Sequence, residues 1–221
     1  INNPTQDVVE KRIATLEGGV AALLVASGMA ATTLAIMNVA QAGDHVVSSS
    51  NVYGGTFNLF NYTLPKFGIE VTFVNDTGNM DAWRAAVKPN TKAFFGEGIS
   101  NPLGAVLDLE AIAQVAHEAG VPWIVDNTIA TPYVTRPFDY GVDIITHSAT
   151  KFLSGHGNAM VGAIVDSGNF DFAKNPEKFP GFNEPDPSYN NLVYAKTLGV
   201  GGDFGANLAY IFKARLQLLR D

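Results

Sequence analysis

The sequence predicts an α/β protein whose mostly parallel sheet is covered by helices on both faces. Short apolar segments recur along its 221 residues, and helical patterns lie between them. Apolar residues make up 47% of the chain and charged residues 16%, a balance typical of a globular protein with a sizeable core. Strands that are apolar on both faces and are separated by helices are typical of a buried parallel sheet.

The expected strands are the short apolar segments themselves, because each lies between turn signals and is too short for a helix. They occupy residues 45–49, 70–74, 92–97, 122–126, 143–147 and 162–166.

Helices are expected where apolar residues return every three or four positions, which is the case in residues 7–18, 55–68 and 107–120. Asp108 is a suitable N-cap for the last of these helices, and Gly120 is a suitable end. Pro65 interrupts the last turn of the second helix.

The two ends of the chain suggest a fragment of a longer protein. The first residue is Ile1 rather than methionine, and a helical pattern in residues 206–221 stops without a C-cap glycine. Before it, residues 167–191 are rich in Pro, Asn and Gly and are expected to form a long loop. Long loops in compact domains are often functional.

Composition argues against several classes of function. The net charge is −7 with no basic stripe, so a nucleic-acid partner is not expected. The absence of cysteine excludes disulfides, thiolate metal sites and cysteine nucleophiles, and is compatible with a reducing, cytoplasmic location. Polar residues interrupt the apolar residues 20–40, so no membrane span is expected, and the start of the chain does not resemble a signal peptide.

Polar clusters follow the expected strands and predict a ligand site. In open α/β sheets, ligands bind beyond the carboxyl ends of the strands. The clusters at these ends comprise Asn51 and Tyr53, Ser100 and Asn101, Asp126 and Asn127, and residues 148–151.

Lys151 and Asp126 are the candidate reactive groups. A lysine forms an imine with an aldehyde only when it is desolvated or lies near other positive charge, which a position just after a buried strand can supply. A carboxylate at a buried strand end needs a partner, such as a protonated pyridine nitrogen. The alternatives are a surface lysine and, for Asp126, a helix N-cap or an ion pair with Arg136.

Other residues could bind an anion and a flat ring. Ser27 and Gly28 precede a helical segment whose first N–H groups could bind phosphate, and the alternative is an ordinary Ser N-cap. Ser148 and Thr150 could add hydroxyl donors or form a turn motif. Tyr53 could stack on a cofactor ring or be an ordinary tyrosine.

His147 and His156 flank the lysine without a carboxylate at ligand spacing, so no metal site is expected. Together, the lysine, the carboxylate, the aromatic ring and the anion-binding helix start are the parts needed to hold pyridoxal 5′-phosphate (PLP).

Residues 143–157, DIITHSATKFLSGHG, resemble the PLP attachment signature of the Cys/Met-metabolism family of PLP-dependent enzymes. The segments NNPT…LE, SGMAA, VYGGTF, SNP and VDNT agree with that family in order and spacing, so the resemblance covers essentially the whole chain. It implies an aspartate-aminotransferase-type (fold-type I) PLP-binding large domain over residues 1–221 and a homotetramer built from dimers that share active sites.

The resemblance also implies a role for each site residue. Lys151 would form the Schiff base with PLP and move protons, Asp126 would pair with the pyridine nitrogen, and Tyr53 would stack on the ring. Phosphate ligands would be the N–H groups of Gly28 and Met29 and the hydroxyls of Ser148 and Thr150, and Asn101 would lie near the ring 3-hydroxyl.

Residues 179–194 and 126–152 look most like O-acetylhomoserine sulfhydrylases. Methionine γ-lyases usually carry a cysteine where this chain has Gly55, and cystathionine-type members tend to read E-S/T-P-S-N-P where it has EGISNP. The expected reaction replaces the acetyl group of O-acetyl-L-homoserine with sulfide or a small thiol. Cystathionine γ-synthase or methionine γ-lyase chemistry is the alternative within the family, and a non-catalytic ligand-binding domain is the alternative outside it.

Family members carry a Tyr-x-Arg before the N-P-T segment and a small C-terminal domain with an arginine that binds the substrate carboxylate. Both would lie outside residues 1–221, so this chain is expected to be inactive alone.

Overall fold

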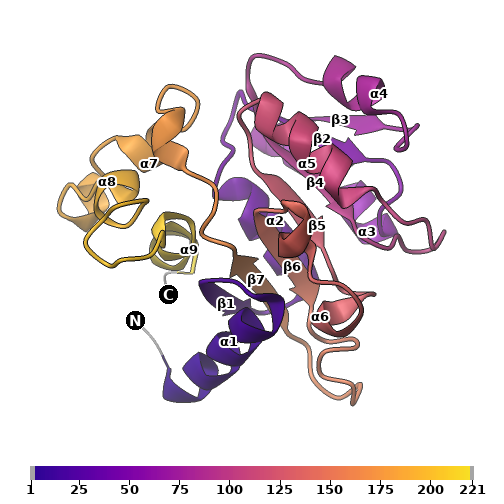
Figure 1. Cartoon of the computed structure of the whole chain (residues 1–221), viewed down its shortest axis with the longest axis horizontal. Coiled ribbons are helices and arrows are strands. Elements are labelled where there is room, and N and C mark those ends of the chain that lie inside the picture. Colours follow the sequence, from indigo (N-terminus) through magenta and orange to yellow (C-terminus); the bar gives the residue numbers. More distant parts are fainter. Residues whose placement is uncertain (1–2, 220–221) are drawn as a thin grey trace.

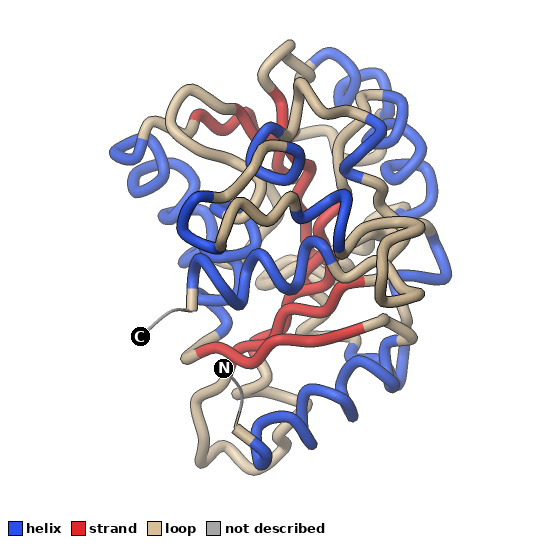
Figure 2. The backbone as a smooth tube through the Cα atoms, turned by 90° about the vertical axis from the view of Figure 1, so that its left-hand side faces the viewer, coloured by secondary structure: helices blue, strands red, loops and turns tan. Residues whose placement is uncertain are grey.

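The computed structural model describes residues 3–219, which form one seven-stranded sheet with helices on both sides (Figures 1 and 2). The strand order is β1-β7-β6-β5-β4-β2-β3. Pairing is parallel between β2 and β3, β2 and β4, β4 and β5, and β5 and β6, whereas β7 runs antiparallel to both its neighbours. The predicted mostly parallel α/β sheet is therefore confirmed.

The predicted strands are all present, with ends that differ by at most one residue. The sheet also contains a strand that the sequence reading missed, β1, inside the apolar residues 20–40. Hydropathy alone does not separate a buried strand from the buried helix that follows it. The strands are β1 (Ala21–Val25), β2 (His45–Ser49), β3 (Glu70–Val74), β4 (Thr91–Glu97), β5 (Trp123–Asp126), β6 (Ile144–Ser148) and β7 (Gly162–Asp166).

The predicted first and third helices are also confirmed, together with their local signals. The side chain of Asp108 accepts a hydrogen bond from the Ala111 N–H at 3.0 Å, as an N-cap should. Asn3 caps the first helix in the same way, and Gly18 ends it with a φ of 81°. The α-helices are α1 (Pro4–Glu17), α2 (Gly28–Met37), α3 (Gly54–Asn58), α4 (Met80–Ala85), α5 (Leu109–Glu118), α6 (Thr131–Val134), α7 (Pro180–Asn183), α8 (Tyr194–Thr197) and α9 (Ala209–Lys213).

The predicted helix at residues 55–68 is helical but not uniformly α. After α3 the chain forms a π-helical turn at Leu59–Thr63 and then a 3₁₀ turn at Leu64–Phe67, which ends at Gly68. Pro65 lacks the N–H that a continuing α-helix would require, which accounts for the change in hydrogen bonding.

The expected long loop at residues 167–191 is more structured than predicted. It contains α7 and two 3₁₀ turns, and it continues into α8 (left in Figure 1). Phe172 and Phe182 stack with ring centroids 3.9 Å apart, and both stack on Tyr210 of α9. This aromatic packing, which is not visible as a sequence period, holds the segment against the body of the protein.

Helices on the two sides of the sheet bury its central strands. The helix α2 lies against β6 and β7, and α5 lies against β5. Trp83 of α4 and Trp123 of β5 are both fully buried, with ring centroids 5.8 Å apart. Within residues 3–219, no helix is both long and apolar enough to cross a membrane.

Candidate active site

Three neighbouring parallel strands bring the predicted site to one edge of the sheet. Glu97 and Asp126 are the last residues of β4 and β5 and are paired in register, and Asp126 is paired in turn with Thr146 of β6. Two residues further on, β6 ends at Ser148. The carboxyl ends of these strands therefore place Asp126 and Ser148 at the same edge, as the sequence predicts.

Asp126 is a partly buried carboxyl group without an arginine partner. Its Oδ1 accepts the Thr128 N–H at 2.9 Å, and Arg136 pairs instead with Asp139 at 3.0 Å. Burial raises the pKa of Asp126, and its hydrogen bonds with Thr128 oppose that shift. A carboxylate in this environment would be stabilised by a cation placed against it, which is what a protonated pyridine nitrogen supplies.

The start of α2 packs directly against Ser148. A Cβ atom on Gly28 would lie 2.5 Å from the Ser148 Cβ, so only glycine allows this approach. Ser27 caps the helix by accepting the Ala30 N–H at 3.1 Å. The N–H groups of Gly28 and Met29 belong to the first turn, where the helix offers no acceptor. These groups beside the Ser148 hydroxyl make an anion-binding corner.

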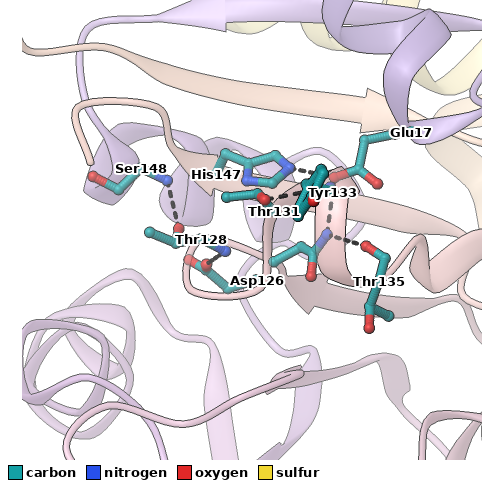
Figure 3. Close-up of polar contacts among 9 residues, drawn as sticks. Glu17, Asp126, Thr128, Thr131, Tyr133, Thr135, His147 and Ser148 are labelled. Carbon is teal, nitrogen blue, oxygen red and sulfur yellow. Dashed lines mark hydrogen bonds and ion pairs between the residues drawn. The ribbon is translucent and has the colours of Figure 1, made fainter. Parts of the chain in front are cut away.

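Thr128 links the two ends of this site, and the sequence reading gave it no role. Its N–H donates to Asp126, and its Oγ1 accepts the Ser148 N–H at 2.8 Å (Figure 3). The hydroxyl of Thr150, by contrast, exchanges hydrogen bonds with the main chain of Val161 at 3.0 and 3.1 Å. The Thr150 hydroxyl is therefore engaged by a segment 11 positions further along the chain.

Lys151 lies in the turn that follows β6, three residues after Ser148. The Lys151 N–H donates to the Ser148 carbonyl at 3.1 Å, and the Lys151 carbonyl accepts the Gly155 N–H at 2.9 Å. The side chain is exposed, and it makes no hydrogen bond or ion pair within residues 3–219. Its amine is therefore not held by the protein, and the main chain alone fixes its attachment point beside Ser148.

Tyr53 and Asn101 follow β2 and β4. The Tyr53 side chain is 49% exposed, and a Cβ atom on Gly55 would lie 2.5 Å from its ring. The main-chain N–H groups of Tyr53 and Asn101 both donate to the carboxylate of Glu97, at 2.6 and 2.9 Å. Sequence reasoning missed this role for Glu97.

A buried Glu17–His147 pair lies behind the site. Glu17 Oε1 and His147 Nε2 are 2.5 Å apart, and both side chains are fully buried. The Asn127 side chain also donates to Glu17 Oε1, at 3.0 Å. The two partners are 130 positions apart in the sequence, so no local pattern could have indicated the contact. Within the described residues, no cluster of His, Cys, Asp or Glu could hold a metal ion.

The residues present fit PLP. The close approach of the start of α2 to Ser148, which only a glycine at position 28 allows, suits a phosphate. The partly buried Asp126 carboxyl suits a cationic ring nitrogen. The fold and this edge of the sheet define an α/β enzyme class that uses PLP. The chain belongs to the Cys/Met metabolism PLP-dependent enzyme family, whose model matches residues 1–212.

Known relatives agree with this family. The chain is 52% identical to a homocysteine synthase of Schizosaccharomyces pombe and 49% identical to an O-acetyl-L-homoserine sulfhydrylase of Leptospira meyeri, over 99% of its length in each case. It spans only 49% of each of these relatives, which is about half their length.

The crystal structure of an O-acetylhomoserine (thiol)-lyase from Campylobacter jejuni, which contains a pyridoxyl-lysine phosphate, matches with a TM-score of 0.90 and 41% identity. That match covers 100% of this chain and 52% of the other.

Proposed function

We propose that the protein containing this chain replaces the acetyl group of O-acetyl-L-homoserine with sulfide or a small thiol. The products are homocysteine, or methionine when the thiol is methanethiol, and acetate. The observation that carries this proposal is the 49–52% identity, over 99% of the chain, to relatives named for homocysteine synthesis and for O-acetylhomoserine sulfhydrylation.

In this proposal the cofactor is held at both of its ends. Gly28, Met29 and Ser148 bind the phosphate, and Asp126 faces the ring nitrogen. Tyr53 covers one face of the ring, and Asn101 lies near its 3-hydroxyl. The close approach of Gly28 to Ser148 and the burial of Asp126 support these assignments. Thr150 is the weakest of the proposed phosphate ligands, because Val161 engages its hydroxyl.

When bound, PLP supplies an electron sink for charge that develops at the substrate α-carbon. Lys151 is proposed to hold the cofactor covalently and then to move protons at its Nζ atom, as general base and general acid. Such proton transfer contributes ~10²–10⁴-fold to a rate. The Asp126 carboxylate keeps the ring nitrogen protonated, which maintains the sink.

We further propose that residues 1–221 are the PLP-binding large domain, that the full protein adds a small C-terminal domain, and that it forms a cytoplasmic homotetramer of dimers with shared active sites. The matched relatives are about twice as long as this chain, which supports the proposal that the full protein contains a further domain. The absence of cysteine is compatible with a reducing compartment.

The test uses the full-length protein and its Lys151→Ala variant. Borohydride should fix a pyridoxyl group on Lys151 of the wild type, and Lys151→Ala should show neither this adduct nor turnover. Three product analyses separate the candidate reactions. O-acetylhomoserine plus sulfide tests replacement by sulfide, O-acylhomoserine plus cysteine tests cystathionine synthesis, and methionine alone tests γ-elimination. A colourless wild type that borohydride does not modify would instead indicate a non-catalytic binding domain.

A further inference from the structure

We propose that Glu97 is a positioning residue that fixes Tyr53 and Asn101 relative to each other through one buried carboxylate. This inference rests on the proposed function, in which Tyr53 covers the cofactor ring and Asn101 lies at its 3-hydroxyl. Glu97 itself would not touch the substrate or the cofactor, and it would act through the main chain of these two residues.

The geometry is that of a two-armed clamp. Glu97 is the last residue of β4, and only 4% of its surface is exposed. Its Oε1 accepts the Tyr53 N–H at 2.6 Å, and its Oε2 accepts the Asn101 N–H at 2.9 Å. Tyr53 immediately precedes α3, and Asn101 begins the turn after β4. One side chain thus joins two segments that are 48 positions apart in the sequence.

Both arms matter because neither segment is fixed by its own side chain. The Tyr53 ring is half-exposed and Asn101 is exposed, so packing of these two side chains does not set their positions, although the preceding residues Val52 and Ser100 are buried. A hydrogen bond from a main-chain N–H fixes the point from which each side chain extends. Small displacements of groups that orient a reacting molecule reduce rates steeply.

The clamp lies directly beside the proposed partner of the ring nitrogen. Glu97 and Asp126 are paired in register on neighbouring strands, and the Gly98 N–H donates to the Asp126 carbonyl at 3.1 Å. Tyr53, Asn101 and Asp126 are therefore all positioned by the paired ends of β4 and β5.

The Glu97 carboxylate is held by hydrogen bonds from main-chain N–H groups and not by a salt bridge within the described residues. No Lys, Arg or His contacts the Glu97 carboxylate within the described residues, so the two N–H groups are its main stabilising partners. Burial, together with the negative charge of Asp126, raises the pKa of Glu97 to about 7, while the two N–H donors oppose this shift. The two hydrogen bonds should be strongest when Glu97 is deprotonated, because hydrogen bonds to a charged acceptor are about twice as strong as neutral ones.

Two substitutions separate the clamp from simple packing. In Glu97→Gln, the amide oxygen can accept only one of the two N–H groups, and its NH₂ would face the other, so one arm is lost with almost no change in volume. In Glu97→Asp, the shorter side chain keeps the charge but cannot reach both donors. The control for loss of a buried carboxylate is Glu10→Gln: Glu10 lies on α1, is 3% exposed and accepts the Leu24 N–H at 2.8 Å, and unlike Glu97 it also pairs with Arg215.

The experiment compares these variants in the full-length holoenzyme. Both Glu97 variants should still be trapped on Lys151 by borohydride, but the visible circular dichroism of the bound cofactor should change, and kcat should fall ~10–100-fold with a smaller change in KM. Glu10→Gln should leave the dichroism and kcat unchanged. If Glu97→Gln does not fold, Glu97→Asp provides the same measurements.

A double-mutant cycle tests whether Glu97 acts through Tyr53. The combination Glu97→Gln with Tyr53→Ala should cost less than the two separate losses added together, because the clamp has little left to position. Wild-type dichroism and kcat in both Glu97 variants, or strictly additive losses, would overturn this inference. A wild type that is not trapped on Lys151 would instead overturn the proposed function.

Discussion

Replacing Gly28 with alanine tests the anion-binding corner most directly. The added Cβ would lie 2.5 Å from the Ser148 Cβ, 2.8 Å from its Cα and 2.9 Å from its Oγ. Carbon atoms in contact prefer about 3.5–4.0 Å, so α2 and Ser148 must separate by roughly 1 Å. Overpacking of this kind costs ~1–3 kcal/mol, and the better helix propensity of alanine returns up to ~1 kcal/mol.

The loss should appear in phosphate binding more than in stability. Separating the donors by roughly 1 Å should weaken PLP binding by ~10–100-fold, because hydrogen bonds to a charged group contribute ~1.5–3 kcal/mol. Affinity for pyridoxal, which lacks the phosphate, should be nearly unchanged. Both are measured by absorbance titration of the full-length apoprotein with each ligand.

The control is Gly78→Ala, since a Cβ at that position would have no neighbour within 4 Å. The reasoning is refuted if Gly28→Ala binds PLP as tightly as the wild type, or if pyridoxal and PLP are weakened equally.

Three further predictions concern the Tyr53 ring and two buried carboxyl groups. Gly55→Ala places a Cβ 2.5 Å from the Tyr53 ring and should lower kcat by ~10-fold or more, whereas Gly54→Ala, with nothing within 4 Å, should not; equal kcat values would contradict the ring's role. Glu17→Ala leaves buried His147 unpaired and should cost ~3 kcal/mol in urea denaturation. Glu118→Ala, in the exposed pair with Arg84, should cost much less, and similar losses would count against the buried pair. Burial raises the pKa of Asp166 to about 7, so the folded state retains a proton that the unfolded state releases near 3.8. The free energy of unfolding should therefore fall as pH rises from about 4 to 7, by up to ~4 kcal/mol. Asp166→Asn should flatten that dependence in urea titrations, and an unchanged slope would exclude Asp166 as its source.

The sequence by itself determined the sheet class and most strands, and it supplied the candidate site residues, because these depend on local patterns. Apolar segments and cap residues such as Asp108 act over a few positions, so they can be read without a fold. The order of the polar clusters along the chain also sufficed to group Asp126, Ser148 and Lys151, since parallel strands end at a common edge.

Tertiary structure decided the contacts that join distant segments. The Tyr53 arm of the Glu97 clamp spans 44 positions and the Glu17–His147 pair spans 130. Neither these contacts nor the approach of Gly28 to Ser148 leaves a periodic trace in the sequence. Likewise, β1 could not be separated from α2, because both are apolar and only pairing with β7 distinguishes a strand from a helix there. Local chemistry selects which side chains are available, but only the packed sheet fixes which of them share a hydrogen bond.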